Sequence, residues 1–111
     1  ANRQMVDIFQ PDINWVGGFT GCVRICHIAE AAGLAVILHA GMNTAFGQHL
    51  SIAMPSVPWG ECFVGTPPGV PLEEAVVFPG TPVPVNGQLT PNDAPGFGFE
   101  MSLDMLSEMT I

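Results

Sequence analysis

Short apolar runs alternate with amphipathic stretches along the first half of the chain, which is typical of consecutive strand–helix units. Residues 6–10, Val-Asp-Ile-Phe-Gln, predict a strand that ends at Pro11. After the Gly17-Gly18 turn, Thr20 is expected to cap a helix that runs to about Ala32. The buried side of this helix should consist of the apolar residues Val23, Ile25, Cys26 and Ile28.

A continuous apolar run at residues 34–38 predicts a second strand, of the kind that is covered on both faces in a parallel sheet. His39 stands directly at its carboxyl end. Asn43 or Thr44 can cap a second helix, which should extend to about Met54. Two prolines end that segment, and a short third strand is expected around residues 60–64.

The second half of the chain has a different composition. Residues 65–95 are rich in proline and glycine, so they predict little regular structure apart from one tight hairpin around Asn86-Gly87. Residues 102–108 predict one last short helix. We therefore divide the chain into a strand–helix part, residues 1–64, and a Pro/Gly-rich tail, residues 65–111.

Three parallel strands with two helices do not close a barrel on their own. A complete (β/α) barrel takes roughly 250 residues, so these strands would be the last three of one. Hydrophobic residues make up 48% of the chain and charged residues only 11%, which is about half the usual charged share of a soluble domain. The low charge indicates that other parts of a larger protein cover much of this surface, and we expect the chain to be a fragment.

The net charge of −8 disfavours nucleic acid and anionic membranes as partners, because Arg3 and Arg24 are the only basic residues apart from histidine. No apolar run has the length of a membrane span, and the first residues do not resemble a signal peptide. The chain has three cysteines, an odd number that does not form a dense disulfide framework, and this favours a reducing compartment. The expected location is therefore the cytoplasm.

Several motifs stand at or near the predicted strand ends. They are QPDINWVGG at residues 10–18, His39, and PWGE at residues 58–61, with PVPVNG at 82–87 and PGFG at 95–98 in the tail. Asp12 and His39 have the spacing of the Asp-His dyad of the mandelate racemase family, and PWGE resembles that family's eighth-strand glutamate segment. Taken in series, these motifs resemble the mandelate racemase branch of the enolase superfamily, most of all its acid-sugar dehydratases of the rhamnonate type.

The resemblance implies an α/β fold: the last three strands and helices of a (β/α)7β TIM-like barrel, with a tail that packs on a capping domain. It also implies a Mg²⁺-dependent lyase that removes the proton α to a carboxylate of a sugar acid and expels the β-hydroxyl as water. The family's metal ligands lie on the third to fifth strands, so no ligand is assigned within this chain. The intact protein is expected to be a homo-oligomer. Two alternatives stay open: a racemase or cycloisomerase of the same superfamily, and a non-catalytic truncated product.

The chemistry of such a dyad follows from the reaction. Removal of an α-proton creates an enediolate, which requires a base that works near neutral pH and stabilisation of the new negative charge. Enzymes of this reaction type use a lysine or a histidine as the base. The chain contains no lysine, so His39 is the expected base. Asp12 can fix the tautomer of His39, and Glu61 can hydrogen-bond the carboxylate oxygen whose charge grows.

Each candidate also has an ordinary structural interpretation. Asp12 could be a turn aspartate, His39 a hydrogen-bonded polar residue at a strand end, and Glu61 a solvated loop carboxylate. Trp15 and Trp59 could line the substrate pocket or pack in the core. The position of His39 at the carboxyl end of a barrel strand favours the catalytic interpretation, since active sites of such barrels lie at that face.

Two other groups of residues are interpreted as structural. Cys22, Cys26 and His27 do not have the spacing of a zinc knuckle, and no second pair completes a set of four ligands. His49 lies within the second predicted helix and is expected to pack there or lie on its surface.

Overall fold

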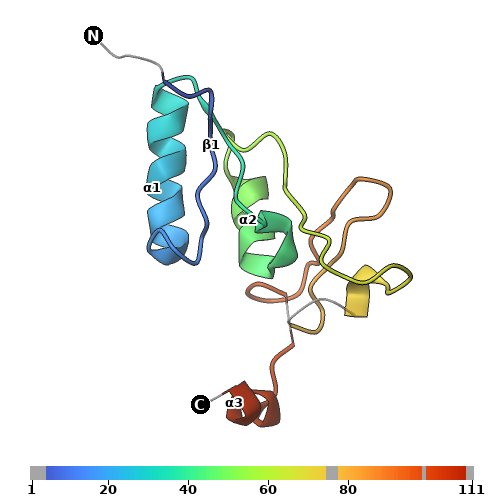
Figure 1. The fold of residues 1–111 in the computed structure, drawn as a ribbon. Coiled ribbons are helices and arrows are strands. Elements are labelled where there is room, and N and C mark those ends of the chain that lie inside the picture. Colours follow the sequence, from blue (N-terminus) through green and yellow to red (C-terminus); the bar gives the residue numbers. More distant parts are fainter. Residues whose placement is uncertain (1–4, 75–77, 99, 110–111) are drawn as a thin grey trace.

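A computed structural model describes residues 5–74, 78–98 and 100–109 (Figure 1). Its elements, in chain order, are β1 (Ile8–Phe9), α1 (Gly18–Ala31), β2 (Ala35–Val36), a 3-10 turn (Gly41–Asn43), α2 (Ala45–Ala53), a 3-10 turn (Leu72–Glu74) and α3 (Leu103–Met109). The strand–helix–strand–helix order confirms an α/β class for the first half of the chain.

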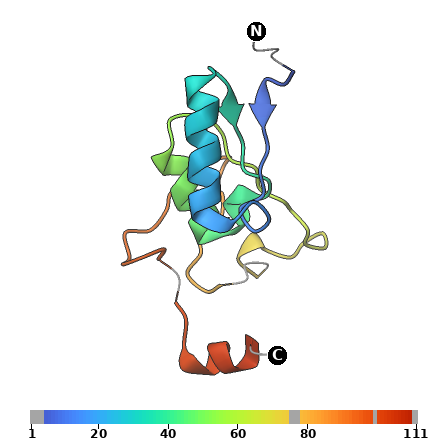
Figure 2. The ribbon, with the colours of Figure 1, turned by 90° about the vertical axis from the view of Figure 1, so that its left-hand side faces the viewer.

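The two strands pair in parallel, with Ile8 opposite Ala35 and Phe9 opposite Val36. Hydrogen bonding continues beyond the strands, because the backbone N–H of His39 donates to the carbonyl of Pro11 at 3.0 Å. Figure 2 shows α1 packed over the two strands, as in a βαβ unit. The crossover therefore brings the carboxyl ends of β1 and β2 to the same edge.

The two faces of this small sheet have different environments. Val36 and Leu38 are buried, and Phe9, opposite Val36, is half-buried in the same cluster under α1. Because successive side chains of a strand alternate between faces, Gln10 and His39 project from the opposite face. That face is exposed here, and it holds the polar side chains of the site.

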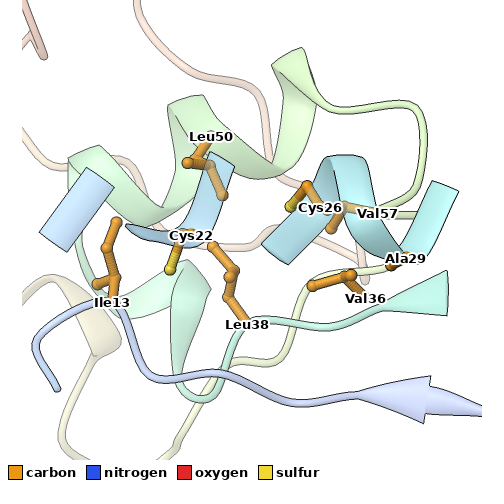
Figure 3. Packing of buried hydrophobic residues seen from close by; sticks show 8 residues of the cluster. All are labelled: Ile13, Cys22, Cys26, Ala29, Val36, Leu38, Leu50 and Val57. Atoms are coloured by element: carbon orange, nitrogen blue, oxygen red, sulfur yellow. The ribbon is translucent and has the colours of Figure 1, made fainter. Parts of the chain in front are cut away.

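The core lies between α1, β2 and α2 and includes one side chain from the loop after β1 (Figure 3). Its buried residues are Ile13, Cys22, Cys26, Ala29, Val36, Leu38, Leu50 and Val57. Of the side chains expected to face inward from α1, Cys26 is buried, whereas Ile28 is 63% exposed, so the prediction was wrong for Ile28. Cys22, Cys26 and Ala29 share one stripe of the helix because they lie four and three residues apart.

The helix starts differ from the prediction in one case and agree in the other. Gly17 has a φ of 92° and directly precedes α1, without a side-chain cap, so the prediction that Thr20 caps this helix was wrong. The left-handed turn at Gly17 lets the chain enter the helix before Thr20 is reached. Thr44 caps α2 as expected, and its hydroxyl accepts a hydrogen bond from the backbone N–H of Gly47 at 3.2 Å.

The short strand expected at residues 60–64 does not form. The side-chain amide of Asn43 occupies both backbone groups of Phe63: its oxygen accepts from the N–H at 2.7 Å, and its nitrogen donates to the carbonyl at 2.7 Å. The segment contacts the sheet earlier, at Ser56, whose carbonyl accepts from the N–H of Val36 at 2.8 Å. At Phe63, therefore, both backbone groups are bound by a side chain and not by a neighbouring strand.

The hairpin of the tail is confirmed by reciprocal backbone hydrogen bonds between Val85 and Gln88, at 2.8 and 3.0 Å. Asn86 and Gly87 have φ values of 52° and 76°, as a type I′ turn requires. The last helix also forms: Ser102 accepts a hydrogen bond from the N–H of Met105 at 3.2 Å at the start of α3. Among the described residues, no helix is both long enough and apolar enough to cross a bilayer.

Candidate active site

The Asp12 and His39 side chains meet at the carboxyl edge of the β1–β2 pair. They are 27 positions apart in the sequence, and Asp12 Oδ2 lies 3.2 Å from His39 Nδ1. The parallel ladder sets this distance, since the hydrogen bond from His39 to the carbonyl of Pro11 places the histidine beside the residue that follows Pro11. The side chains are 57% exposed for His39 and 25% for Asp12, so solvent reaches the pair on this face.

The Asp12 carboxylate is oriented by the turn that follows it. Its Oδ1 accepts hydrogen bonds from the backbone N–H of Asn14 at 2.8 Å and from the Asn14 side-chain amide at 3.2 Å. Its carbonyl accepts from the N–H groups of Trp15 and Val16 at 3.0 and 3.1 Å. One carboxylate oxygen is thereby held by the turn, which leaves Oδ2 for His39.

These hydrogen bonds lower the pKa of Asp12 below its ordinary value. The largest contribution is the backbone N–H of Asn14; the hydrogen bond with His39 and that of the Asn14 side chain also lower it, and they outweigh partial desolvation. Asp12 is therefore ionised at neutral pH. An ionised carboxylate only accepts hydrogen bonds, so Nδ1 of neutral His39 carries its proton and Nε2 keeps a free lone pair.

Glu61 joins the same strand end through a neighbour of the dyad. Its carboxylate accepts a hydrogen bond from the side-chain amide of Gln10, and its backbone carbonyl accepts from the N–H of Met42 at 2.9 Å. Gln10 was not singled out as a site residue from the sequence. Its position two residues before Asp12 places both side chains on one strand face, and this alternation is the signal that could have identified it.

Trp15 and Trp59 are both largely exposed, at 85% and 68%, so the core-packing interpretation is wrong for both in the described structure. Trp59 lines a cavity of about 340 Å³, together with Met42 and Leu89. Neither Asp12 nor His39 is among the lining residues of that cavity. A substrate-binding role for the two tryptophans stays a prediction.

The remaining histidine and cysteine candidates have structural surroundings. His49 packs edge-on against Phe97, with ring centroids 5.7 Å apart, which confirms a packing role. Cys22 and Cys26 are fully buried in the core, and burial raises the pKa of both thiols. Within the described ranges, no group of three or more histidine, cysteine, aspartate or glutamate side chains is arranged to hold a metal ion.

Comparison with known proteins supports the resemblance seen in the motifs. A model of the enolase C-terminal domain-like family matches residues 1–105. A protein of Caldivirga maquilingensis, provisionally named L-rhamnonate dehydratase, is 34% identical over 103 residues, which cover 91% of this chain and 25% of that protein.

Two solved structures share the fold. The crystal structure of L-rhamnonate dehydratase from Gibberella zeae aligns with a TM-score of 0.75 and 30% identity, over 93% of this chain and 27% of that one. An enolase from Pantoea ananatis with bound D-gluconate and Mg aligns with a TM-score of 0.70 and 24% identity, over 95% of this chain and 25% of that one. In these neighbours the matched domain is an α/β fold of the TIM-barrel type.

The chain spans about a quarter of the length of the relatives it matches. The match to the family model nevertheless covers nearly all of it, including both residues of the Asp12–His39 pair. The chain therefore belongs to the enolase C-terminal domain-like family, within the enolase superfamily.

Proposed function

We propose that this chain supplies the acid–base residues of an acid-sugar dehydratase that removes the proton α to a carboxylate. The observation that carries the proposal is the 3.2 Å approach of Asp12 Oδ2 to His39 Nδ1 at the carboxyl edge of two parallel strands. In barrels of this type the chemistry takes place at that edge. The dehydratase names of the matched Caldivirga and Gibberella proteins support this choice of reaction.

His39 acts as the base through Nε2, because Nδ1 keeps its proton and donates a hydrogen bond to Asp12. Nε2 takes the α-proton of the sugar acid, and the electron pair of the C–H bond forms the enediolate. When the β C–O bond breaks, the imidazolium can return this proton to the departing hydroxyl, which leaves as water. The enol that remains tautomerises to a 2-keto-3-deoxy acid. Asp12 keeps its negative charge throughout and stabilises the imidazolium.

Glu61 has a different role in the proposal. We place its carboxyl group next to the substrate carboxylate, where it would share a proton with the oxygen whose charge grows as the enediolate forms. The contact between Glu61 and Gln10 supports a location on the same strand face as the dyad. Trp15 and Trp59 are kept as proposed substrate contacts at the rim.

A Mg²⁺ ion would supply positive charge over the substrate carboxylate. The described residues do not fit its binding site. Asp12 is already bound by Asn14 and His39, Glu61 is bound by Gln10, and no acidic cluster accompanies either carboxylate in the described ranges. We assign the metal ligands to strands outside this sequence and derive no step from the metal.

The rest of the protein completes the site. We propose that residues 1–64 correspond to the part of the barrel with strands six to eight, of which β1 and β2 are formed here, and that residues 65–111 form a tail that packs on a capping domain. The exposed face of β1 and β2, which carries Gln10, Asp12 and His39, would then line the barrel interior. The remainder of the barrel and the capping domain are thus partners required for activity, and the intact protein is proposed to be a homo-oligomer.

Product analysis tests the proposed reaction. The intact protein, supplied with Mg²⁺ and a panel of six-carbon and five-carbon sugar acids, is expected to release a 2-keto-3-deoxy acid from at least one of them, detected by mass loss of one water. An epimerised product of unchanged mass would instead assign the protein to the racemase branch. A lactone of the sugar acid has also lost one water but carries no keto group, so a test for the keto group separates it from the dehydration product. If no member of the panel reacts, the proposed activity is wrong.

A further inference from the structure

The Gln10–Glu61 contact crosses β2. The N–H groups of Ala35, Ile37 and His39 all donate to carbonyls on the β1 side, whereas the N–H of Val36 donates to Ser56 on the other side. Ser56, at the start of the segment that leads to Glu61, therefore lies at the far edge of β2. Gln10 and Glu61 thus approach from the two sides of β2, and their side chains meet in a hydrogen bond.

This contact starts from the same strand end that carries Asp12. Gln10 and Asp12 project from the same strand face, and Asp12 reaches His39 on β2 while Gln10 reaches past β2 to Glu61. One strand end thereby holds both proposed reacting side chains. Glu61 itself lies outside any strand, and the hydrogen bonds that hold it are the backbone bond from Met42 and the bond from the Gln10 amide.

We propose that Gln10 is a positioning residue that holds the Glu61 carboxyl group beside the Asp12–His39 pair. This inference rests on the proposed function, because Gln10 would affect catalysis only by positioning Glu61. A glutamine suits this role because its amide offers both a donor and an acceptor, so it can bind the carboxyl group in either protonation state without adding charge next to His39.

A double-mutant cycle in the intact protein tests the role. Gln10→Met keeps the length of the side chain and removes both hydrogen-bonding groups. With the sugar acid found by product analysis, it should lower kcat roughly 10- to 100-fold, the cost of losing a hydrogen bond to a charged group, with little change in KM. In a Glu61→Gln background, Gln10→Met should cause less than about a 2-fold further loss, because the interaction is already altered. Gln88→Met, in the exposed turn of the hairpin, is the matched control and should leave kcat unchanged.

Equal losses from Gln10→Met in both backgrounds would show that it acts independently of Glu61 and would overturn the inference. A crystal structure of the Gln10→Met protein gives a reading that does not depend on turnover. The Glu61 carboxyl group is expected to leave its place beside residue 10. If it keeps that place, Gln10 does not position it, whatever reaction the protein catalyses. Absence of any sugar-acid turnover in the wild-type protein, by contrast, refutes the proposed function. The crystal structure of the Gln10→Met protein still tests whether Gln10 positions Glu61.

Discussion

The backbone N–H of His39 and the carbonyl of Pro11 form the last rung of a parallel ladder, 3.0 Å long. This rung brings the imidazole to the residue that follows Pro11, and Asp12 Oδ2 meets His39 Nδ1 at 3.2 Å. The pair is thus a consequence of strand register. Side chains at the ends of adjacent parallel strands emerge at one edge whenever the crossover helix packs on the sheet.

Asp12→Asn should separate the role of the charge from that of the shape. Asparagine fits the same turn, but it carries no charge to hold the Nδ1 proton of His39 or to stabilise an imidazolium. We expect kcat of the intact protein to fall by a factor on the order of 10²–10⁴, while the variant stays folded and its thermal melting temperature falls only by the small contribution of the carboxylate's hydrogen bonds. Steady-state kinetics and calorimetry on the same preparation check both parts. A loss of less than about 3-fold would remove Asp12 from the mechanism.

The lowered pKa of Asp12 also predicts a pH dependence of stability. A carboxyl group with a lower pKa in the folded state stabilises the protein fully above its ordinary value of 3.8 and loses that contribution as the pH falls through its folded-state pKa. The difference in unfolding free energy between wild type and Asp12→Asn should therefore be constant from pH 7 to about 5 and shrink below about 4. Urea titrations of both proteins at several pH values measure this difference. A difference that grows on acidification would contradict the assigned direction.

Gly47 in α2 lies against the backbone of the turn that follows His39. A Cβ at this position would meet the carbonyl oxygen of Gly41 at 2.2 Å, so Gly47→Ala should destabilise the protein by about 1–3 kcal/mol through overpacking. Gly60→Ala is the matched control, because the three atoms nearest to its Cβ would all belong to the flexible side chain of Met42 and not to backbone. Thermal melts should show the larger drop for Gly47→Ala. Equal effects would mean that the α2 backbone contact is not tight.

Some elements could be predicted from sequence because one local signal decides them. Thr44 is a favoured helix cap, and Asn86-Gly87 supplies the two positive φ angles of a tight hairpin turn. The Asp12–His39 contact could be predicted for a related reason. His39 directly follows the apolar run 34–38, Asp12 follows Pro11 at the end of the first strand, and their spacing resembles that of the family's dyad. Parallel strand ends meet at one edge.

Other features depend on contacts that the sequence pattern does not reveal. The strand expected at residues 60–64 is replaced by hydrogen bonds from the Asn43 side chain to Phe63, 20 positions apart, and no local rule anticipates them. Ile28 is apolar yet exposed, because the buried stripe of α1 runs through Cys22, Cys26 and Ala29 instead. The strand alternation places Gln10 on the face of Asp12, but its contact with Glu61, 51 positions away, has no signal in the local pattern.

The central claim, that His39 is the base, is tested most directly by proton exchange at the substrate α-carbon. The intact protein and its His39→Asn variant are incubated in deuterium oxide with the sugar acid on which the wild-type protein acts, and α-deuterium incorporation and water loss are followed by NMR and mass spectrometry. The account predicts that His39→Asn reduces both by at least about 10²-fold while the variant keeps the wild-type melting temperature. Undiminished exchange and dehydration in the folded variant would contradict it.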